Sequence, residues 1–232
     1  MKTSGREVSS LGRRRQAIPL SVHRSLTLMA TFTNKGFGRK SASANSARIP
    51  PGQHETAGFP VLSAGPTPRI ALADWTFGIG GLVEAPVKWT WEQFNELRQQ
   101  SFTKDIHCVT KWSKLNTHWD GVSIETLLEH VTIKPEARYV MAYSYGGYST
   151  NIPLEGVRDG KAFIGLRFDG QPLTPEHGGP ARLVLPHLYF WKRAKWINGL
   201  RFMANNEPGF WEQYGYSLHG DPWHEQRYRT DD

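Results

Sequence analysis

The sequence has very little cysteine, since Cys108 is the only one among 232 residues. A single cysteine excludes an intramolecular disulfide framework, so a hydrophobic core must hold the fold together. The composition allows such a core, because 38% of the residues are hydrophobic and 12% are aromatic. The chain also lacks any run approaching about 18 consecutive apolar residues, so the sequence predicts no transmembrane segment.

Metal-binding motifs made of protein side chains alone are missing as well. The nine histidines are scattered, none of them belongs to an H-E-x-x-H motif, and the chain contains no C-x-x-C. These absences disfavour a zinc site built only from protein ligands.

Acidic residues are scarce in the first part of the chain. Residues 1–48 contain ten Lys or Arg and one acid, Glu7, whereas the remainder holds 18 basic and 20 acidic residues. The net charge of +7 therefore belongs to this segment. We expect residues 1–45 to form a disordered basic tail, with Met29 as an alternative start of the chain. Because the rest is nearly neutral, we expect no specific nucleic-acid partner.

The basic segment also bears on the compartment. The stretch "GRRRQAIPLSVHRSLTLMATF" places arginines before apolar residues, as a twin-arginine export signal does. His23 and Arg24 interrupt the apolar part, and no clear cleavage site follows. We therefore expect a cytoplasmic location, with a periplasmic location after twin-arginine export as the alternative.

Strand patterns outnumber helical ones in the rest of the chain. Alternation or β-rich composition predicts strands within 74–83, 101–109, 138–144, 161–168, 181–186 and 195–204. A capping box of Thr90 and Gln93 begins a helix with Trp91, Phe94 and Leu97 on one face. A turn is expected at 119–122, followed by Ser123 as the N-cap of a second short helix. The fold class is therefore α+β, with mixed β-sheets and short helices.

The stretch "DIHCVTKWS" places Cys108 at the end of an expected strand. Three interpretations are open for its thiol. A lone cysteine on an apolar strand face is usually a small buried hydrophobe. A nucleophile would need a base, and His107 points to the opposite face of the strand. A single thiolate can also bind a soft metal whose other ligands come from a cofactor.

Two later stretches carry the remaining signals. "EHGGPARLVLP" has a Gly-Gly-Pro turn, which lets the backbone approach another group closely, followed by Arg182 on a strand. "PHLYFWKRAKWI" adds Lys192, Arg193 and Lys195. No Asp or Glu occurs from 177 to 206, so this region attracts anions such as phosphate. The alternatives are a plain loop before a strand and a basic surface face.

Together, in this order, "IHCVTKWS", "HGGPARLVLP" and "YFWKRAKWI" resemble the molybdopterin-binding domain of the sulfite oxidase family. The resemblance runs from about Arg48 to Arg201 and is strongest to short, stand-alone bacterial members. It implies a sulfite oxidase-type α+β fold. It also implies that residues 46–232 form one oxidoreductase molybdopterin-binding domain, whose aromatic C-terminal segment wraps over the core.

The resemblance implies molybdenum-molybdopterin as the cofactor. Cys108 matches the only protein ligand of the molybdenum and is the candidate catalytic residue. The other candidate cofactor-binding residues are those that match cofactor contacts of the related methionine-sulfoxide reductase subunit: Ser144, His177, Arg182, Arg193, Ala194 and Lys195.

The residues after Cys108 bear on the substrate. They read "VTKWS", which resembles the sulfoxide reductase branch and not the basic run that holds sulfite. The resemblance implies two-electron oxygen-atom transfer to or from a small substrate, with sulfoxide or N-oxide reduction favoured over sulfite oxidation. It also implies a separate electron-transfer partner, which is a haem protein, a flavin or a quinone-linked protein. The alternative is a non-catalytic molybdopterin-binding or carrier protein, which would not require Cys108.

Overall fold

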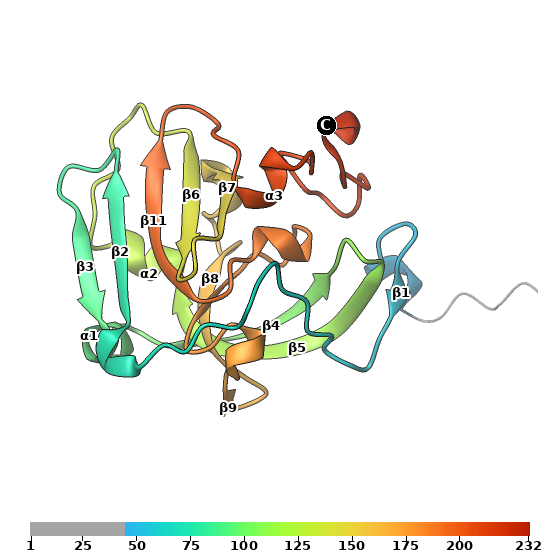
Figure 1. The fold of residues 1–232 in the computed structure, drawn as a ribbon, viewed down its shortest axis with the longest axis horizontal. Helices are drawn as coiled ribbons and strands as arrows, with labels where there is room; N and C mark the ends of the chain where they lie inside the picture. Colours follow the sequence, from blue (N-terminus) through green and yellow to red (C-terminus); the bar gives the residue numbers. More distant parts are fainter. Residues whose placement is uncertain (1–44) are drawn as a thin grey trace, which may run out of the picture. The chain divides into compact units, whose positions relative to one another are not determined.

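A computed structural model describes residues 45–232, so the expected basic tail and the alternative start at Met29 lie outside the described residues. Two β-sheets form the frame of the described part (Figure 1). The larger sheet has six strands, in which β4 and β9 branch from the path β1-β5-β8-β10. Its strands are β1 (His54–Glu55), β4 (Gln100–His107), β5 (Trp112–Ser123), β8 (Phe163–Phe168), β9 (Gln171–Pro172) and β10 (Arg182–Val184). β1 pairs with β5 in parallel, whereas β4 and β8 pair with β5 antiparallel.

The second sheet has the strand order β3-β2-β11-β6-β7. Its strands are β2 (Thr76–Gly81), β3 (Val87–Thr90), β6 (Tyr139–Ser144), β7 (Ser149–Pro153) and β11 (Ile197–Met203). β11 pairs with β2 in parallel and with β6 antiparallel. Both sheets are therefore mixed, which confirms the α+β class with mixed sheets.

The helices are short, and the first two begin where the sequence predicts, whereas the third lies in a stretch for which no helix was expected. They are α1 (Trp91–Glu96), α2 (Ile124–Leu128) and α3 (Phe210–Gln213). The capping box of α1 is present, because Thr90 Oγ1 accepts from the Gln93 amide at 3.3 Å and Gln93 Oε1 accepts from the Thr90 amide at 2.9 Å. Ser123 caps α2 through the Thr126 amide at 3.1 Å. Both predicted caps are confirmed.

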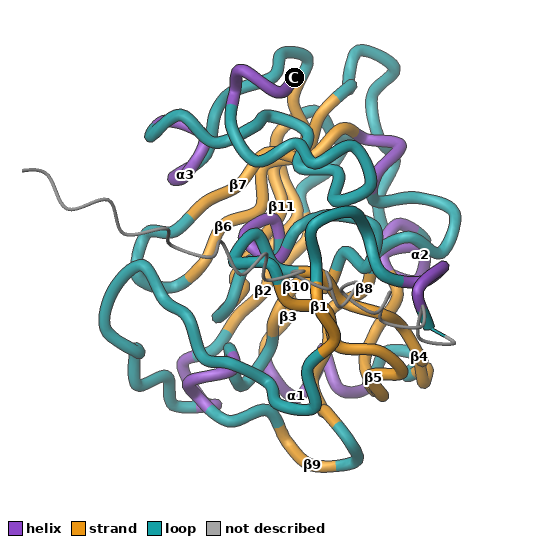
Figure 2. The backbone as a smooth tube through the Cα atoms, turned by 90° about the vertical axis from the view of Figure 1, so that its right-hand side faces the viewer, coloured by secondary structure: helices purple, strands orange, loops and turns teal. Residues whose placement is uncertain are grey.

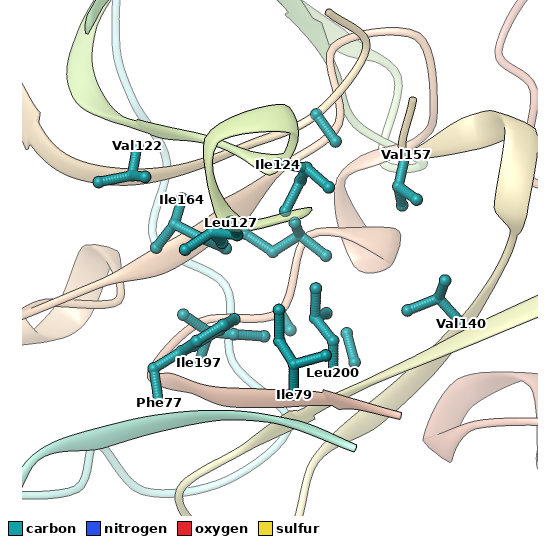
Figure 3. Packing of buried hydrophobic residues seen from close by; sticks show 14 of the residues in the cluster. Phe77, Ile79, Val122, Ile124, Leu127, Val140, Val157, Ile164, Ile197 and Leu200 are labelled. Atoms are coloured by element: carbon teal, nitrogen blue, oxygen red, sulfur yellow. The ribbon is translucent and has the colours of Figure 1, made fainter. Parts of the chain in front are cut away.

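The main core lies between the two sheets. In Figure 3 the side chains of Phe77, Ile79 and Leu200, from the second sheet, face Ile164 of β8 and the residues of α2. Phe77 is fully buried and Ile79 is 2% exposed, as the alternation in β2 predicts. Burial of this apolar surface is the principal term that holds the sheets together.

The turn expected at 119–122 is wrong. These residues continue β5, which runs without interruption to Ser123. The pairing with β8 shifts register between Asp120 and Gly121, so a β-bulge lies where the sequence suggests a reversal. A Cβ on Gly121 would lie 2.0 Å from the Ile164 carbonyl oxygen, so this glycine allows close strand approach and does not mark a turn.

The C-terminal residues lie beside the second sheet. α3 contacts β7, and both views place it next to that strand (Figures 1 and 2). After α3 the chain forms an isolated β-bridge between Tyr216 and Tyr228 and one 3₁₀ helix at Arg229–Asp231. Among residues 45–232, no helix has the length and apolar character needed to cross a membrane.

Candidate functional site

The site is built around the connection between β4 and β5. β4 ends at His107, and Cys108 follows it directly. The Cys108 amide donates to the Trp112 carbonyl at 2.8 Å, and its carbonyl accepts from the Lys111 amide at 3.0 Å. Lys111 adopts a left-handed conformation with φ of 71°, which closes this tight turn. The turn therefore fixes the backbone of Cys108 at the edge of the sheet.

The thiol of Cys108 is enclosed and hydrogen-bonded. Its side chain is only 3% exposed, and Thr110 Oγ1 donates to Sγ at 3.2 Å. Ile106 and Phe102 pack in the same hydrophobic cluster as Cys108.

Cys108 lines a cavity of about 480 Å³. The other walls come from four parts of the chain: a loop after β1, the turn between β6 and β7, the basic stretch after β10, and the segment that begins with α3. The lining residues are Leu62, Ser63, Ala64, Gly65, Pro66, Pro68, Val109, Thr110, Tyr145, Gly146, Gly147, Tyr148, Arg182, Phe190, Trp191, Arg193, Lys195, Trp196, Phe210, Trp211 and Tyr216.

Two buried arginines face this cavity. Arg182 begins β10, and Arg193 directly follows a 3₁₀ helix at Phe190–Lys192. The guanidinium carbons of Arg182 and Arg193 lie 4.4 and 4.8 Å from the centroid of the Phe190 ring, which both cations contact. Arg182 donates to the His177 carbonyl at 2.7 Å, and Arg193 donates to the Leu188 carbonyl at 2.7 Å.

These arginines lack an anionic partner among the described residues. Arg182 Nε and Arg193 Nη1 are buried and donate to no acceptor there. Burial lowers the pKa of Arg182 to about 9, which the charge of Cys108 partly offsets. Burial also lowers the pKa of Arg193 well below its usual value, and the charge of Arg182 lowers it further. A buried cation without a counter-charge costs several kcal/mol, roughly, so the pair favours an anionic ligand.

Lys195 is the third cation of the cavity. Its Nζ donates to the Glu176 carbonyl at 2.6 Å, and burial together with the charge of Arg182 lowers its pKa to about 8. The lysine packs against Gly178, where a Cβ would lie 3.0 Å from Lys195 Cβ. The close approach predicted for the Gly-Gly-Pro turn is thus made by Gly178 to Lys195 and by Gly179 to the Leu173 carbonyl oxygen, which a Cβ would meet at 2.1 Å.

The structure divides the acid-free basic stretch into two groups. Lys192 forms a fully buried ion pair with Glu212 at 2.7 Å, and Arg201 pairs with Glu207 at 2.5 Å. Both acids follow the stretch in sequence. Only Arg182, Arg193 and Lys195 of the five cations line the cavity.

The other three candidate residues lie outside the lining of this cavity. The Ser144 hydroxyl is buried, donates to no acceptor among the described residues, and lies at the end of β6 beside a separate hollow. His177 Nε2 donates to the Phe59 carbonyl at 3.0 Å, its Nδ1 lies 3.1 Å from Thr174 Oγ1, and its ring packs on that of Phe59 at 4.2 Å between centroids. Ala194 is fully buried in the main core. The structure therefore brings four of the seven candidate residues together around one cavity.

His107 faces away from this cavity. Its Nδ1 lies 2.9 Å from Ser113 Oγ, and burial together with the charge of Arg193 lowers its pKa to about 4. It is therefore uncharged at neutral pH and turned from the thiol, so it does not serve Cys108 as a base. Residues 45–232 contain no group of three or more His, Cys, Asp or Glu side chains arranged to hold a metal.

Sequence reasoning missed much of the wall. The cavity is also lined by residues 62–66 and Pro68, by the turn Tyr145–Tyr148, and by the aromatic side chains of Phe210, Trp211 and Tyr216. For the residues from 210 to 216, the signal was the density of aromatic residues near the C-terminus, which indicated packing over the core without a place in the site.

Known proteins share this architecture. A family model described as "Oxidoreductase molybdopterin binding domain" matches residues 64–211, more than half of the chain. The "Uncharacterized oxidoreductase YuiH" of Bacillus subtilis (strain 168) is 42% identical over 196 residues, which cover 84% of this chain and 99% of that protein. The "Putative protein-methionine-sulfoxide reductase subunit YedZ1" of Azospira oryzae is 29% identical over 204 residues, covering 86% of this chain and 77% of that protein.

A solved structure shares the fold. The sulfane dehydrogenase SoxCD from Paracoccus pantotrophus superposes with a TM-score of 0.57 at 23% identity, over 65% of this chain and 43% of that chain. The sulfite oxidase-type fold and the family predicted from the three motifs are confirmed. The chain belongs to the oxidoreductase molybdopterin-binding domain family and is a molybdenum-molybdopterin-dependent oxidoreductase.

Proposed function

We propose that this oxidoreductase transfers an oxygen atom in a two-electron reaction and that it reduces small sulfoxides or N-oxides. The proposal rests on one observation: the buried Cys108 thiol and the buried guanidinium groups of Arg182 and Arg193, which lack an anionic partner among the described residues, line the same cavity. A redox cofactor with a soft metal and an anionic phosphate matches both halves of this arrangement.

The donor set fits the cofactor. Arg182 Nε and Arg193 Nη1 are buried N–H groups without an acceptor in the described part of the chain, and each costs free energy until an acceptor arrives. A phosphate supplies oxygen acceptors and a negative charge at once. The Cys108 thiol, on the same cavity, is the one soft ligand that the described residues offer there.

The residues have distinct roles in this proposal. When bound, the cofactor supplies a metal that cycles between Mo(VI) and Mo(IV). Cys108 holds the metal, and Thr110 orients its sulfur through the hydrogen bond at 3.2 Å. Arg182, Arg193 and Lys195 bind the anionic end. For Ser144, His177 and Ala194 we propose support of this region, because Arg182 donates to the His177 carbonyl and Ala194 lies between the two other basic residues.

The preference for sulfoxides has two supports. Lys111, the cation nearest Cys108 in sequence, is exposed and does not line the cavity, so it does not form an anion clamp for sulfite there. The Azospira relative is also named as a putative protein-methionine-sulfoxide reductase subunit. Both favour a neutral oxygen donor over sulfite.

Electron supply, compartment and domain extent complete the proposal. We propose a separate haem, flavin or quinone-linked protein as the electron donor, because the relative is named as a subunit. The interrupted apolar run at His23 and Arg24 favours the cytoplasm over twin-arginine export to the periplasm. We propose that residues 46–232 act as one domain. Fractionation of cells that express the full chain tests the compartment.

Metal analysis tests the function. Protein from a molybdenum-replete host should carry nearly stoichiometric molybdenum, which Cys108→Ser loses and the exposed control Glu136→Gln retains. The loaded enzyme, reduced with dithionite and benzyl viologen, should then oxidise the dye when a sulfoxide or N-oxide is added. A wild-type protein without molybdenum, or one active with sulfite alone, contradicts the proposal.

A further inference from the structure

We propose that Phe210, Trp211 and Tyr216, hereafter the aromatic wall, form a substrate subsite that selects sulfoxides bearing an uncharged apolar group. The inference rests on the proposed function and names its substrate class. All three side chains line the cavity that contains Cys108. They come from α3 and the loop after it, a part of the chain separate from the basic stretch that binds the cofactor's anionic end.

The aromatic wall reaches the neighbourhood of the thiol. Tyr216, Trp211 and Phe210 line the same cavity as Cys108, together with Val109 and Thr110 that follow it. Tyr148, on the turn between β6 and β7, extends the wall: its ring lies 5.7 Å from that of Phe210 between centroids. A substrate that reaches Cys108 from this side therefore passes aromatic faces.

The chemistry of the lining sets the class of ligand. No Asp or Glu lines the cavity, so a cationic substrate finds no partner there. The three cations are assigned to the cofactor, so an anionic substrate would compete with it. Phe210, Trp211 and Tyr216 are each half-buried, and covering their exposed apolar surface is favourable for a ring or a bulky alkyl group, whereas a methyl group covers little of it. An uncharged group is the ligand that this wall favours.

The wall is held by a buried carboxylate. Glu212 follows Trp211 in α3. Its side chain is fully buried and forms an ion pair with Lys192. Its Oε1 also accepts from Thr150 Oγ1 at 2.7 Å and from Trp191 Nε1 at 3.2 Å. These bonds fix the inner face of α3.

Ring contacts hold the outer part of the wall. The Tyr216 ring lies 5.1 Å from Trp191 and 5.2 Å from Trp211, and the Phe210 ring lies 5.2 Å from Trp211. Aromatic pairs prefer edge-to-face or tilted arrangements, so these contacts restrict the orientation of each ring. The wall is thus a fixed part of the fold, and Glu212 is its positioning residue.

The reduction of the sulfoxide at this subsite needs two electrons from an external reductant. The sulfur–oxygen bond of the sulfoxide breaks, sulfur keeps the electron pair and becomes a sulfide, and the oxygen leaves as water. Two protons from solvent and two electrons from the donor protein, or from reduced benzyl viologen in the assay, complete it. The wall contacts the substituent on sulfur and takes no part in electron transfer.

The first arm of the test measures turnover with two substrates. Methyl phenyl sulfoxide carries a ring, whereas dimethyl sulfoxide does not. In the molybdenum-loaded enzyme, Trp211→Leu should raise KM for methyl phenyl sulfoxide about tenfold, the size expected for one lost aromatic contact with its buried area. KM for dimethyl sulfoxide and kcat for both should change by less than about twofold. Trp223→Leu, an exposed tryptophan outside the lining, is the matched control.

The second arm measures binding without turnover. Methyl phenyl sulfone, which cannot serve as the oxygen donor in this assay, should quench tryptophan fluorescence in wild-type and Trp223→Leu protein, and its affinity should fall about tenfold in Trp211→Leu. Tyr216→Leu serves as a second wall variant if Trp211→Leu does not fold.

The two arms separate the subsite from the proposed function. If the loaded wild type reduces neither sulfoxide but binds the sulfone through the aromatic wall, the sulfoxide reaction fails and the apolar subsite stands. If both wall variants bind the sulfone as the wild type does, or if KM rises equally for both sulfoxides, the subsite is overturned while the sulfoxide reaction stands.

Discussion

Arg182 donates a hydrogen bond from Nη2 to the carbonyl oxygen of Arg193, 3.3 Å away, so two buried guanidinium groups share one corner of the cavity. Two like charges so placed repel each other, and burial strengthens the repulsion. No carboxylate lies within ion-pair distance of either group in the part of the chain that the structure describes. The corner is therefore prepared for an anion before one binds.

Phosphate binding at this corner should depend on pH through Lys195. Burial and the charge of Arg182 lower its pKa to about 8, so the free lysine is charged below that value and neutral above it. A bound anion favours the charged form, so affinity is full below about pH 8 and falls as pH rises further. Calorimetric titration of cofactor-free protein with inorganic phosphate checks this. Lys195→Arg should move the decline to higher pH, toward the pKa of about 9 of Arg182, and a flat profile in the wild type would contradict the expectation.

Thr110 should tune the redox potential of the metal. Its hydroxyl donates to Cys108 Sγ at 3.2 Å, and a hydrogen bond to a ligating sulfur withdraws electron density from it. In Thr110→Val the sulfur becomes a stronger donor, the oxidised metal is favoured and the midpoint potential falls. A redox titration followed by the Mo(V) electron paramagnetic resonance signal measures the shift. Thr110→Ser keeps the hydroxyl and should keep the potential; equal shifts in both variants would exclude this role.

The ion pair of Lys192 and Glu212 should contribute strongly to stability. Both side chains are fully buried, so Glu212→Gln leaves an unpaired cation in the core and should lower the free energy of unfolding by about 3–5 kcal/mol. The surface pair of Arg98 and Glu129 is the matched control, because its side chains are 58% and 56% exposed. Arg98→Gln should cost less than about 1 kcal/mol. Urea unfolding measures both, and similar losses would show that burial does not set the value.

Gly121 should be intolerant of a side chain. A Cβ there would lie 2.0 Å from the Ile164 carbonyl oxygen, so Gly121→Ala forces β5 away from β8 and should cost about 1–3 kcal/mol. Gly80 lies in β2 with no atom within 4 Å of its Cβ position. Gly80→Ala is therefore the control and should be nearly neutral in thermal unfolding. A neutral Gly121→Ala would mean that the register shift at this bulge is not needed.

Local patterns predicted the elements that local physics determines. The capping box at Thr90 and the N-cap at Ser123 depend on neighbours within a single turn, so the sequence was sufficient for both. The alternation of apolar and small residues that predicts β2 arises because only one face of the strand is buried, and this pattern is visible in the sequence alone. The bulge at Gly121 depends on Ile164 of another strand, and no local pattern contains that partner.

The same limit applies to the site. Arg182, Arg193 and Lys195 were predicted from one continuous stretch and its resemblance to a family. Lys192 belongs to that stretch yet turns away, because its partner Glu212 comes twenty residues later and only tertiary folding brings them together. The aromatic wall was missed for this reason, since its place beside Cys108 follows from long-range contacts and not from spacing.

The cavity has walls from both sides of Cys108 in the sequence, the loop at 62–68 and the aromatic residues from Phe210 to Tyr216. A chain emerging from the ribosome therefore completes the walls of this cavity only after residue 216 has left the exit tunnel. We therefore expect the cavity to take up its cofactor after the segment that contains Phe210 and Tyr216 has folded against the rest.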